Sequence, residues 1–329
     1  MPAPTFRVHR AAPVLLCACL LALTMASLAE ARPKTTAADL RVVDSGNRTL
    51  TEGTQLTGPV KVKTDPKATC FGPGTGGSGD RVSVPGSTAL GQLANAGKSN
   101  RAVSPLGITD FFDFGLGICR IGSAVSPQSG YWYLKVDHEA SFSGADQTKV
   151  RPGDEILWYL IEDYSDPVPD ELVLRAPATA DPGRPFEVEV ISRADDGEAS
   201  PAAGASVTGA DAPTDDRGRT TVTVDGRTAD LVASRAGSIV SNEEIVCTRA
   251  LRNCPAGYAT TVAGTGKADR IRAGKASERI LAGGGKDRID ARRGKAPDRI
   301  NCGPGRDRLV LPKHSGSKYR SCERVKHRG

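Results

Sequence analysis

Five acidic side chains recur near the C-terminal end of the chain at a nearly fixed spacing, and they form its most regular set of chemically active residues. They are Asp269, Glu278, Asp287, Asp298 and Asp307, at intervals of nine, nine, eleven and nine residues. Each is followed by an arginine and then by isoleucine or leucine. Because self-similarity at a short, fixed period is typical of stacked repeats, we expect equivalent side chains to lie above one another on successive units.

Two of the units resemble a known calcium-binding repeat. "AGGGKDRID" and "CGPGRDRLV" are similar to the nonapeptide G-G-x-G-x-D-x-U-x of RTX-type (hemolysin-type) β-rolls. In those repeats a turn binds Ca²⁺ through backbone carbonyls and the aspartate, and a short strand places its U side chain in the core. The resemblance implies that the five acidic residues are candidate calcium ligands. It also implies a core made of Ile271, Ile280, Ile289, Ile300 and Leu309.

Other units depart from the calcium-binding pattern. "AGKASERIL" has alanine at a turn glycine and glutamate in place of aspartate, and "ARRGKAPDRIN" carries two extra residues and a proline. Residues 264–311 contain thirteen Lys and Arg against six acidic residues, whereas calcium favours a dense set of oxygen ligands. We therefore expect a shortened, metal-free roll closed by a Cys302–Cys322 disulfide, with calcium binding as the alternative.

The arginine after each acidic residue offers a second chemistry. If the roll forms, these arginines point outward, with Arg270, Arg288 and Arg308 on one sheet and Arg279 and Arg299 on the other. Neighbours would lie about 4.8 Å apart, the spacing of adjacent strands. Like charges so close repel unless anions lie between them, and guanidinium groups bind phosphate and carboxylate well. This pattern predicts that the tail binds an anionic polymer of the cell envelope, without specificity for nucleic acid.

The charge distribution supports the same interpretation. Residues 264–329 carry nineteen Lys and Arg against seven acidic residues, although the whole chain has a net charge of only +6. A basic tail on an acidic body suits contact with polyanions at one end. The alternative is a tail whose charge only keeps it soluble.

The first residues have the pattern of a secretory signal, which we assign to residues 1–31. A basic start precedes the apolar run from Ala11 to Leu28, and small residues flank the expected cleavage site before Arg32. The run is too short for a membrane span, and no later segment is long and apolar enough for one. We therefore expect a secreted, extracellular product, either free or held at the cell wall. A lipoprotein anchored through Cys19 is the alternative.

Export makes the remaining cysteines informative. The six that follow the signal segment are Cys70, Cys119, Cys247, Cys254, Cys302 and Cys322. An even number of cysteines in an oxidising compartment predicts disulfides. Their spacing favours sequential pairs within each region, although other connectivities stay open. Zinc is not expected, because no CxxC motif occurs and histidine is scarce.

Residues 39–165 contain two aromatic segments, "GYWYLKVDHEAS" and "KVRPGDEILWYL", with the composition of strands. The stretch from Thr88 to Ala96 is the one expected helix, with a capping residue at its start. The aromatic segments resemble a bacterial domain of unknown function related to the C-terminal domain of transcobalamin, although Asp137-His138 replaces that family's Asn-Gly turn. The resemblance implies a β-grasp-like fold, in which a helix crosses a small sheet.

The same resemblance implies an alternative function, because the transcobalamin domain helps to cover a corrinoid. A face for a corrinoid-like small ligand would consist of Tyr131, Trp132, Tyr133, Trp158 and Tyr159. The competing interpretation is that half of these side chains fill a core beneath the helix, as alternating strand residues do.

Residues 170–249 alternate apolar and polar side chains in short runs, and Phe186, Val188 and Val190 fall on one face of such a run. Half a dozen short strands between turns predict a β-sandwich. "PATADPGRPFEVEV", "PAAGASVTG" and "TDDRGRTTVTV" resemble the Ig-like repeats of bacterial surface proteins, which implies a spacer module.

No catalytic constellation is recognisable in the sequence. The chain lacks HExxH, GxSxG and Walker motifs, and acidic pairs such as Asp195-Asp196 fall in polar turns. We therefore expect a non-enzymatic, mainly β multidomain protein: a β-grasp-like α+β head, an Ig-like β-sandwich at 170–249 and a short degenerate β-roll tail at 264–329. Its expected function is binding or structural, at the cell envelope.

Overall fold

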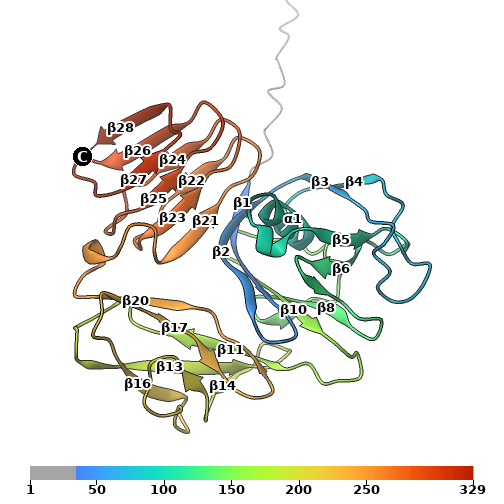
Figure 1. The fold of residues 1–329 in the computed structure, drawn as a ribbon, viewed down its shortest axis with the longest axis horizontal. Helices are drawn as coiled ribbons and strands as arrows, with labels where there is room; N and C mark the ends of the chain where they lie inside the picture. Colours follow the sequence, from blue (N-terminus) through green and yellow to red (C-terminus); the bar gives the residue numbers. More distant parts are fainter. Residues whose placement is uncertain (1–34, 329) are drawn as a thin grey trace, which may run out of the picture. The chain divides into compact units, whose positions relative to one another are not determined.

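The computed structural model describes residues 35–328, so the predicted signal segment, residues 1–31, lies outside the described residues. The described chain consists mainly of strands in several sheets, with a single α-helix (Figure 1). This confirms the prediction of a mainly β fold. No helix within residues 35–328 is long and apolar enough to cross a membrane.

The N-terminal region places one helix against a mixed sheet. Helix α1 (Ala89–Ser99) begins where expected, and the Thr88 hydroxyl accepts a hydrogen bond from the Gly91 backbone N–H at 3.1 Å. Leu90 and Leu93 of the helix are fully buried in a core that includes Trp158. The strands are β1 (Thr36–Val43), β2 (Thr49–Thr57), β3 (Val60–Lys63), β4 (Arg81–Val84), β5 (Leu106–Thr109), β6 (Gly117–Ile121), β7 (Ala124–Val125), β8 (Tyr131–Val136), β9 (Glu139–Ala140) and β10 (Glu155–Ile161). In the main sheet, β1 lies between β2, which is antiparallel to it, and β10, which is parallel.

The middle region consists of short strands around a separate core. Its strands are β11 (Asp170–Arg175), β12 (Thr179–Ala180), β13 (Pro185–Arg193), β14 (Ala199–Pro201), β15 (Ser206–Val207), β16 (Arg219–Thr223), β17 (Thr228–Leu231), β18 (Ala233–Ser234), β19 (Ser238–Ile239) and β20 (Glu244–Thr248). The alternation in β13 is clear, because Val188 and Val190 are buried whereas Glu187 is exposed. The core also contains Leu172 and Leu174.

The C-terminal region is a coil whose successive strands alternate between two parallel sheets. We call residues 260–328 the coil. Its strands are β21 (Thr260–Ala263), β22 (Arg270–Arg272), β23 (Glu278–Leu281), β24 (Arg288–Asp290), β25 (Arg299–Asn301), β26 (Arg308–Pro312), β27 (Lys318–Arg320) and β28 (Arg324–Arg328). One sheet has the order β22-β24-β26-β28, and the other contains β21-β23-β25-β27. The five apolar residues assigned to the core, Ile271, Ile280, Ile289, Ile300 and Leu309, are at most 2% exposed.

The coil shares a sheet with the N-terminal region. Strand β21 pairs in parallel with β2, through Thr54 opposite Val262 and Gln55 opposite Ala263. The result is one nine-stranded sheet that runs from β27 to β9. Leu56 of β2 belongs to the apolar core of the coil. The first turn of the coil is therefore covered by a strand about 200 residues earlier in the chain.

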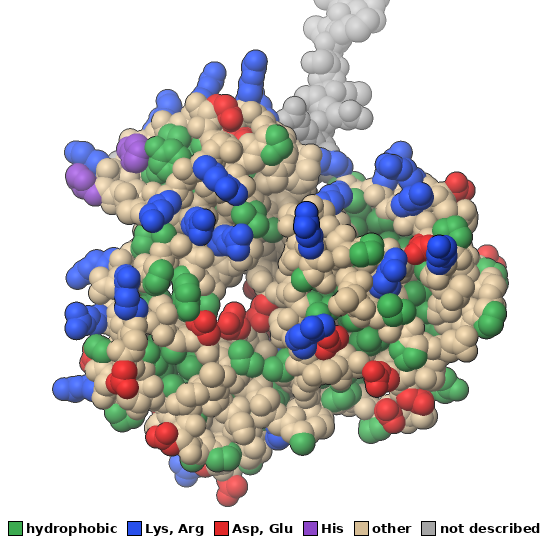
Figure 2. All heavy atoms as spheres, viewed as in Figure 1, with side chains coloured by type: hydrophobic (Ala, Val, Ile, Leu, Met, Phe, Trp, Pro, Cys, Tyr) green, Lys and Arg blue, Asp and Glu red, His purple; other side chains and the backbone are tan. Residues whose placement is uncertain are grey.

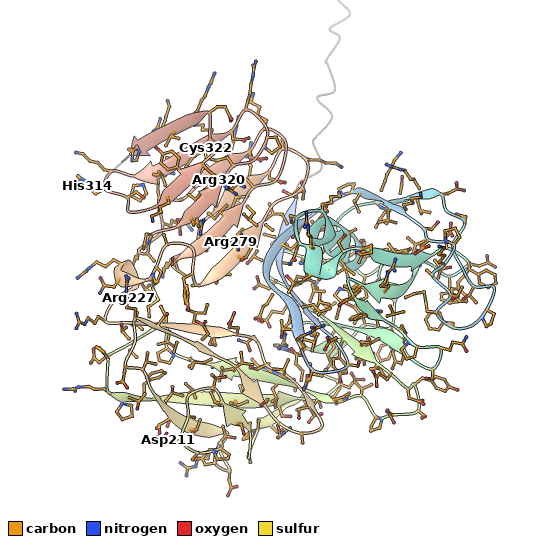
Figure 3. All side chains as sticks on the ribbon, in the orientation of Figure 1. Asp211, Arg227, Arg279, His314, Arg320 and Cys322 are labelled. Carbon is orange, nitrogen blue, oxygen red and sulfur yellow. A yellow bond between two sulfur atoms is a disulfide. The ribbon has the colours of Figure 1, made fainter. Side chains whose placement is uncertain are left out.

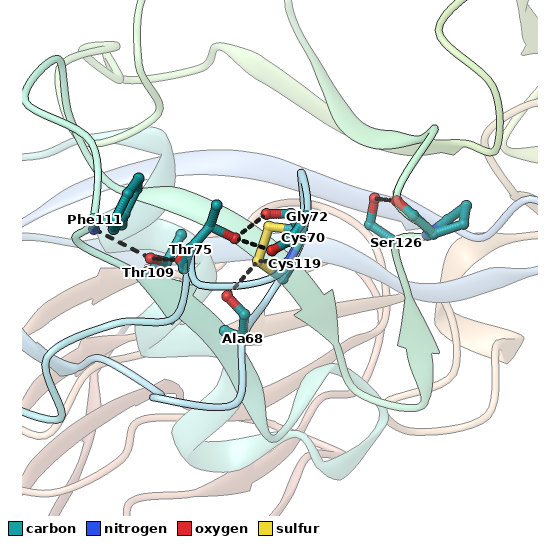
Figure 4. The surroundings of a disulfide bond; sticks show 9 residues. Ala68, Cys70, Gly72, Thr75, Thr109, Phe111, Cys119 and Ser126 are labelled. Carbon is teal, nitrogen blue, oxygen red and sulfur yellow. Dashed lines mark hydrogen bonds between the residues drawn. A yellow bond between two sulfur atoms is a disulfide. The ribbon is translucent and has the colours of Figure 1, made fainter.

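Three disulfides connect the six cysteines in sequential pairs, Cys70–Cys119, Cys247–Cys254 and Cys302–Cys322. The first lies in the N-terminal region (Figure 4). The second joins β20 to the segment before the coil, and the third links the residue after β25 to the segment between β27 and β28.

Candidate functional site

The coil brings its outward-facing cations into two columns. Arg270, Arg288 and Arg308 are register partners in β22, β24 and β26, and Arg324 of β28 follows them. We call this set of four arginines the four-rung column. On the other sheet, Arg279 and Arg299 are register partners, followed by Lys318. We call these the three-rung column, to which Arg279, labelled in Figure 3, belongs.

No acidic side chain within residues 35–328 forms a salt bridge with the cations of either column. All seven side chains are exposed. The coil does pair one arginine, because Arg292 binds Asp290. Stacked strands lie about 4.8 Å apart, so each column concentrates positive charge. Such an arrangement can bind phosphate or carboxylate groups.

Sequence reasoning missed two members of these columns, Arg324 and Lys318. A signal for Arg324 was present, because Glu323-Arg324-Val325 repeats the order acidic, arginine, aliphatic. It lies outside the regular spacing, sixteen residues after Asp307. Lys318 had no such signal, since Ser317 precedes it and Tyr319 follows it.

The five acidic residues lie in the turns of the coil and are at most 8% exposed. Asp269 and Glu278 accept hydrogen bonds from backbone N–H groups of their own turns, those of Thr265 and Gly274. The other three carboxylates accept from backbone N–H groups of a neighbouring turn. Asp287 Oδ1 accepts from Asp269 N at 2.8 Å, Asp307 Oδ1 accepts from Asp287 N at 2.8 Å, and Asp298 Oδ1 accepts from Glu278 N at 3.0 Å. These three carboxylates therefore connect stacked turns to one another.

One oxygen of most of these carboxylates is buried without a partner among the described residues. The atoms are Glu278 Oε2, Asp287 Oδ2, Asp298 Oδ2 and Asp307 Oδ2. Burial raises the pKa of Glu278 and of Asp287 to about 7 and that of Asp298 to about 6. It also raises the pKa of Asp269. A proton or a cation would satisfy such oxygens.

Calcium fits this arrangement only in part. The unpartnered oxygens are hard donors of the kind that calcium prefers. However, no group of three or more His, Cys, Asp or Glu side chains within residues 35–328 is placed to hold a metal ion together. The carboxylates are instead distributed one to a turn, and each already accepts a hydrogen bond from a backbone N–H group.

The structure does not place the five candidate ligand-binding aromatics on one face. Trp132 and Trp158 are 7% and 1% exposed and belong to the core beneath α1. Tyr131, Tyr133 and Tyr159 are half-buried on the other face of the sheet. The hydroxyl of Tyr133 hydrogen-bonds Asp195 of the middle region, while Tyr159 packs against an apolar cluster.

Sequence reasoning also missed an acidic cavity of about 560 Å³. Six carboxylates line it: Asp39, Glu52, Glu155, Glu171, Glu243 and Glu244. Figure 2 shows acidic side chains along the lower edge of the central hollow of the molecule. Its one buried guanidinium, Arg41, is already bound to Glu171 and to the Val240 carbonyl. Because these residues are scattered from position 39 to position 244, no local pattern could reveal the cavity.

A cluster of phenylalanines is the other unpredicted surface feature. Phe71, Phe111 and Phe114 are 49%, 55% and 75% exposed and surround Phe112, with ring centroids 5.1–5.6 Å apart. The Cys70–Cys119 disulfide lies beside them (Figure 4). The Thr109 hydroxyl, which donates to the Thr75 carbonyl at 2.5 Å, accepts from the Phe111 N–H at 3.1 Å. These hydrogen bonds hold the loop in place. In the sequence, the run "FFDF" at residues 111–114 indicated a cluster of phenylalanines here.

No protein family model, curated protein or solved structure matches the chain. Function must therefore be argued from the chemistry of these sites.

Proposed function

We propose that this is a secreted, non-enzymatic binding protein of the cell envelope, whose coil contacts anionic polymers through its cation columns. The observation that carries the proposal is the register of Arg270, Arg288 and Arg308, exposed and without salt bridges among the described residues. Stacked like charges destabilise a sheet unless counter-charges lie between them. A polymer with regular phosphate or carboxylate groups would provide those counter-charges.

The N-terminal and middle regions would carry this coil. Within this proposal, the N-terminal region is a β-grasp-like head, the middle region is an Ig-like spacer, and the coil is a shortened β-roll of the RTX type. Three disulfides support the extracellular location, because disulfides persist in oxidising compartments.

We further propose that the coil folds without metal. The support is the hydrogen bond that each buried carboxylate makes with a backbone N–H group, as Asp287 does with Asp269. Calcium would be the alternative occupant of the unpartnered oxygens.

The corrinoid-like ligand face has weaker support. Burial of Trp132 and Trp158 leaves only the three tyrosines of that set for contact with a small ligand.

Sedimentation of the mature chain with purified cell wall tests the main proposal. We expect binding at low salt and at least a tenfold loss of affinity on raising salt from about 50 to 200 mM, because bound cations release counter-ions. Replacement of Arg270, Arg279, Arg288, Arg299 and Arg308 by glutamine should abolish binding. Binding that is insensitive to salt, or that survives this replacement, would contradict the proposal.

A further inference from the structure

We infer that the anionic polymer is held on one face of the coil only, the sheet β22-β24-β26-β28, and that it runs across these strands. The inference rests on the proposed function and specifies the face, the direction and the chemical class of the polymer. That class is a linear chain with repeated phosphate or carboxylate groups.

The four-rung column gives this face its direction. Its rungs follow one another in register from Arg270 to Arg324. With about 4.8 Å between strands, four rungs span roughly 14 Å perpendicular to the strands. A polymer that crosses the strands can place successive anions against successive guanidinium groups. A polymer parallel to β28 would meet Arg324, Lys326 and Arg328, but one parallel to β24 or β26 would meet a single arginine. Only a polymer that crosses the strands engages a cation on all four of them.

A hollow beside the column adds a place for a further anionic group. Arg272 follows Arg270 by two residues and is also exposed, so it lies on the same face. A hollow of about 280 Å³ is lined by Arg272, Asp290, Arg292 and Arg293. The Asp290 carboxylate accepts two hydrogen bonds from the Arg292 guanidinium, at 2.8 and 2.6 Å, and one from the Arg292 backbone N–H at 3.2 Å. These bonds, with a smaller contribution from the charge of Arg272, lower the pKa of Asp290 to about 2.

The hollow contains two further cations, Arg272 and Arg293, beside the Asp290–Arg292 pair. Asp290 stays ionised and neutralises Arg292. Arg272 and Arg293 form no salt bridge with any residue between 35 and 328. Arg272 is the register partner of Asp290, and its charge also helps to lower the Asp290 pKa. The hollow therefore holds three guanidinium groups against one carboxylate, an excess of positive charge that suits one anionic group of the polymer.

The three-rung column is less suited to an anionic polymer. Arg279 lines a small cavity together with Glu52 of the N-terminal region. Glu52 also lines the acidic cavity, with Glu243 and Glu244. A polyanion that followed this sheet beyond β23 would approach these carboxylates, and juxtaposed like charges oppose binding. The sheet β22-β24-β26-β28 contains no strand from outside the coil.

Two charge-matched double variants of the mature chain test the inference. R288Q/R308Q removes two rungs of the four-rung column, and R279Q/R299Q removes the same charge from the three-rung column. The probes are poly(glycerol phosphate) and poly-L-glutamate, measured by calorimetry at low salt. We expect R288Q/R308Q to weaken binding about a hundredfold, at roughly tenfold for each charged contact. R279Q/R299Q should weaken it by less than about threefold, through long-range charge alone.

The salt dependence gives an independent readout. With four rungs engaged, log K should fall against log salt with a slope of about −3, and R288Q/R308Q should reduce that slope by about half. All four arginines are exposed, so unchanged circular dichroism and melting temperature will show that the variants fold.

The outcomes separate the inference from the proposed function. Equal losses in the two variants would overturn the single face but leave polyanion binding intact. Failure of the unaltered chain to bind either polymer or cell wall would overturn the proposed function itself.

Discussion

Glu52 is a carboxylate of the acidic cavity whose pKa is raised far above its ordinary value. Burial raises its pKa from 4.5 to about 7, Arg41 opposes this shift, and Glu243 and Glu244 add to it. An acid with a raised pKa binds more protons in the folded state than in the unfolded state. Its contribution to stability is therefore fully present below about pH 4.5 and is lost as the pH rises through about 7.

Replacing Glu52 by glutamine should remove this pH dependence. In the unaltered protein, Glu52 Oε1 accepts a hydrogen bond from the Glu243 backbone N–H at 3.1 Å. The glutamine amide keeps an oxygen that can accept this hydrogen bond but carries no charge. We expect Glu52→Gln to raise the free energy of unfolding by about 3 kcal/mol at pH 8 and to leave it unchanged near pH 4. Urea unfolding at several pH values measures this.

The exposed Glu198 provides the control for that variant. Glu198→Gln removes the same charge from a turn and should change stability little. If Glu52→Gln left the slope of stability between pH 5 and 8 as it is in the unaltered chain, burial of Glu52 would not be its cause.

At the scale of the element, variants of the coil carboxylates can test whether these side chains have a structural role or bind a metal ion. Asp287 accepts the Asp269 N–H inside the protein. Asp287→Ala removes this acceptor and should lower the free energy of unfolding by about 2 kcal/mol. Asp287→Asn keeps an acceptor oxygen and should cost much less.

Calcium distinguishes the two roles. If the coil folds without metal, thermal unfolding of the unaltered chain and of both Asp287 variants will be the same in calcium and in a chelator. A melting temperature that rises with calcium in the unaltered chain and not in Asp287→Asn would instead assign Asp287 to a metal site.

The elements differ in how far they could be predicted from the sequence. The core of the coil could be predicted because Ile271, Ile280 and Ile289 recur at a fixed period. Helix α1 could be predicted from its cap, Thr88. The acidic cavity could not, because its carboxylates lie on strands of different regions, such as Glu52 on β2 and Glu244 on β20, and only the tertiary fold brings these strands together. The aromatic segments showed where strands lie, but not that Tyr133 would contact Asp195 of another region.

At the scale of the molecule, the nine-stranded sheet was the least predictable feature. The pairing of β2 with β21 joins residues near 55 to residues near 263. Neither strand has a local pattern that selects the other, because β pairing depends on edges left open by the rest of the fold. The sequence boundary at 264 also falls after β21, the strand that makes this connection.

This sheet predicts that the coil will not fold as an isolated tail. In a fragment of residues 250–329, β21 would lose its partner β2, and the core would lose Leu56, which is 2% exposed in the whole chain. We expect the fragment to lack cooperative thermal unfolding even with Cys302–Cys322 oxidised. In the whole chain, Leu56→Ala should lower the free energy of unfolding by about 3 kcal/mol, since it leaves a cavity in the first turn of the coil. Val82→Ala, on β4 away from the coil, serves as the control. Cooperative melting of the fragment would mean that the coil covers its own first turn and that β2 merely lies against it.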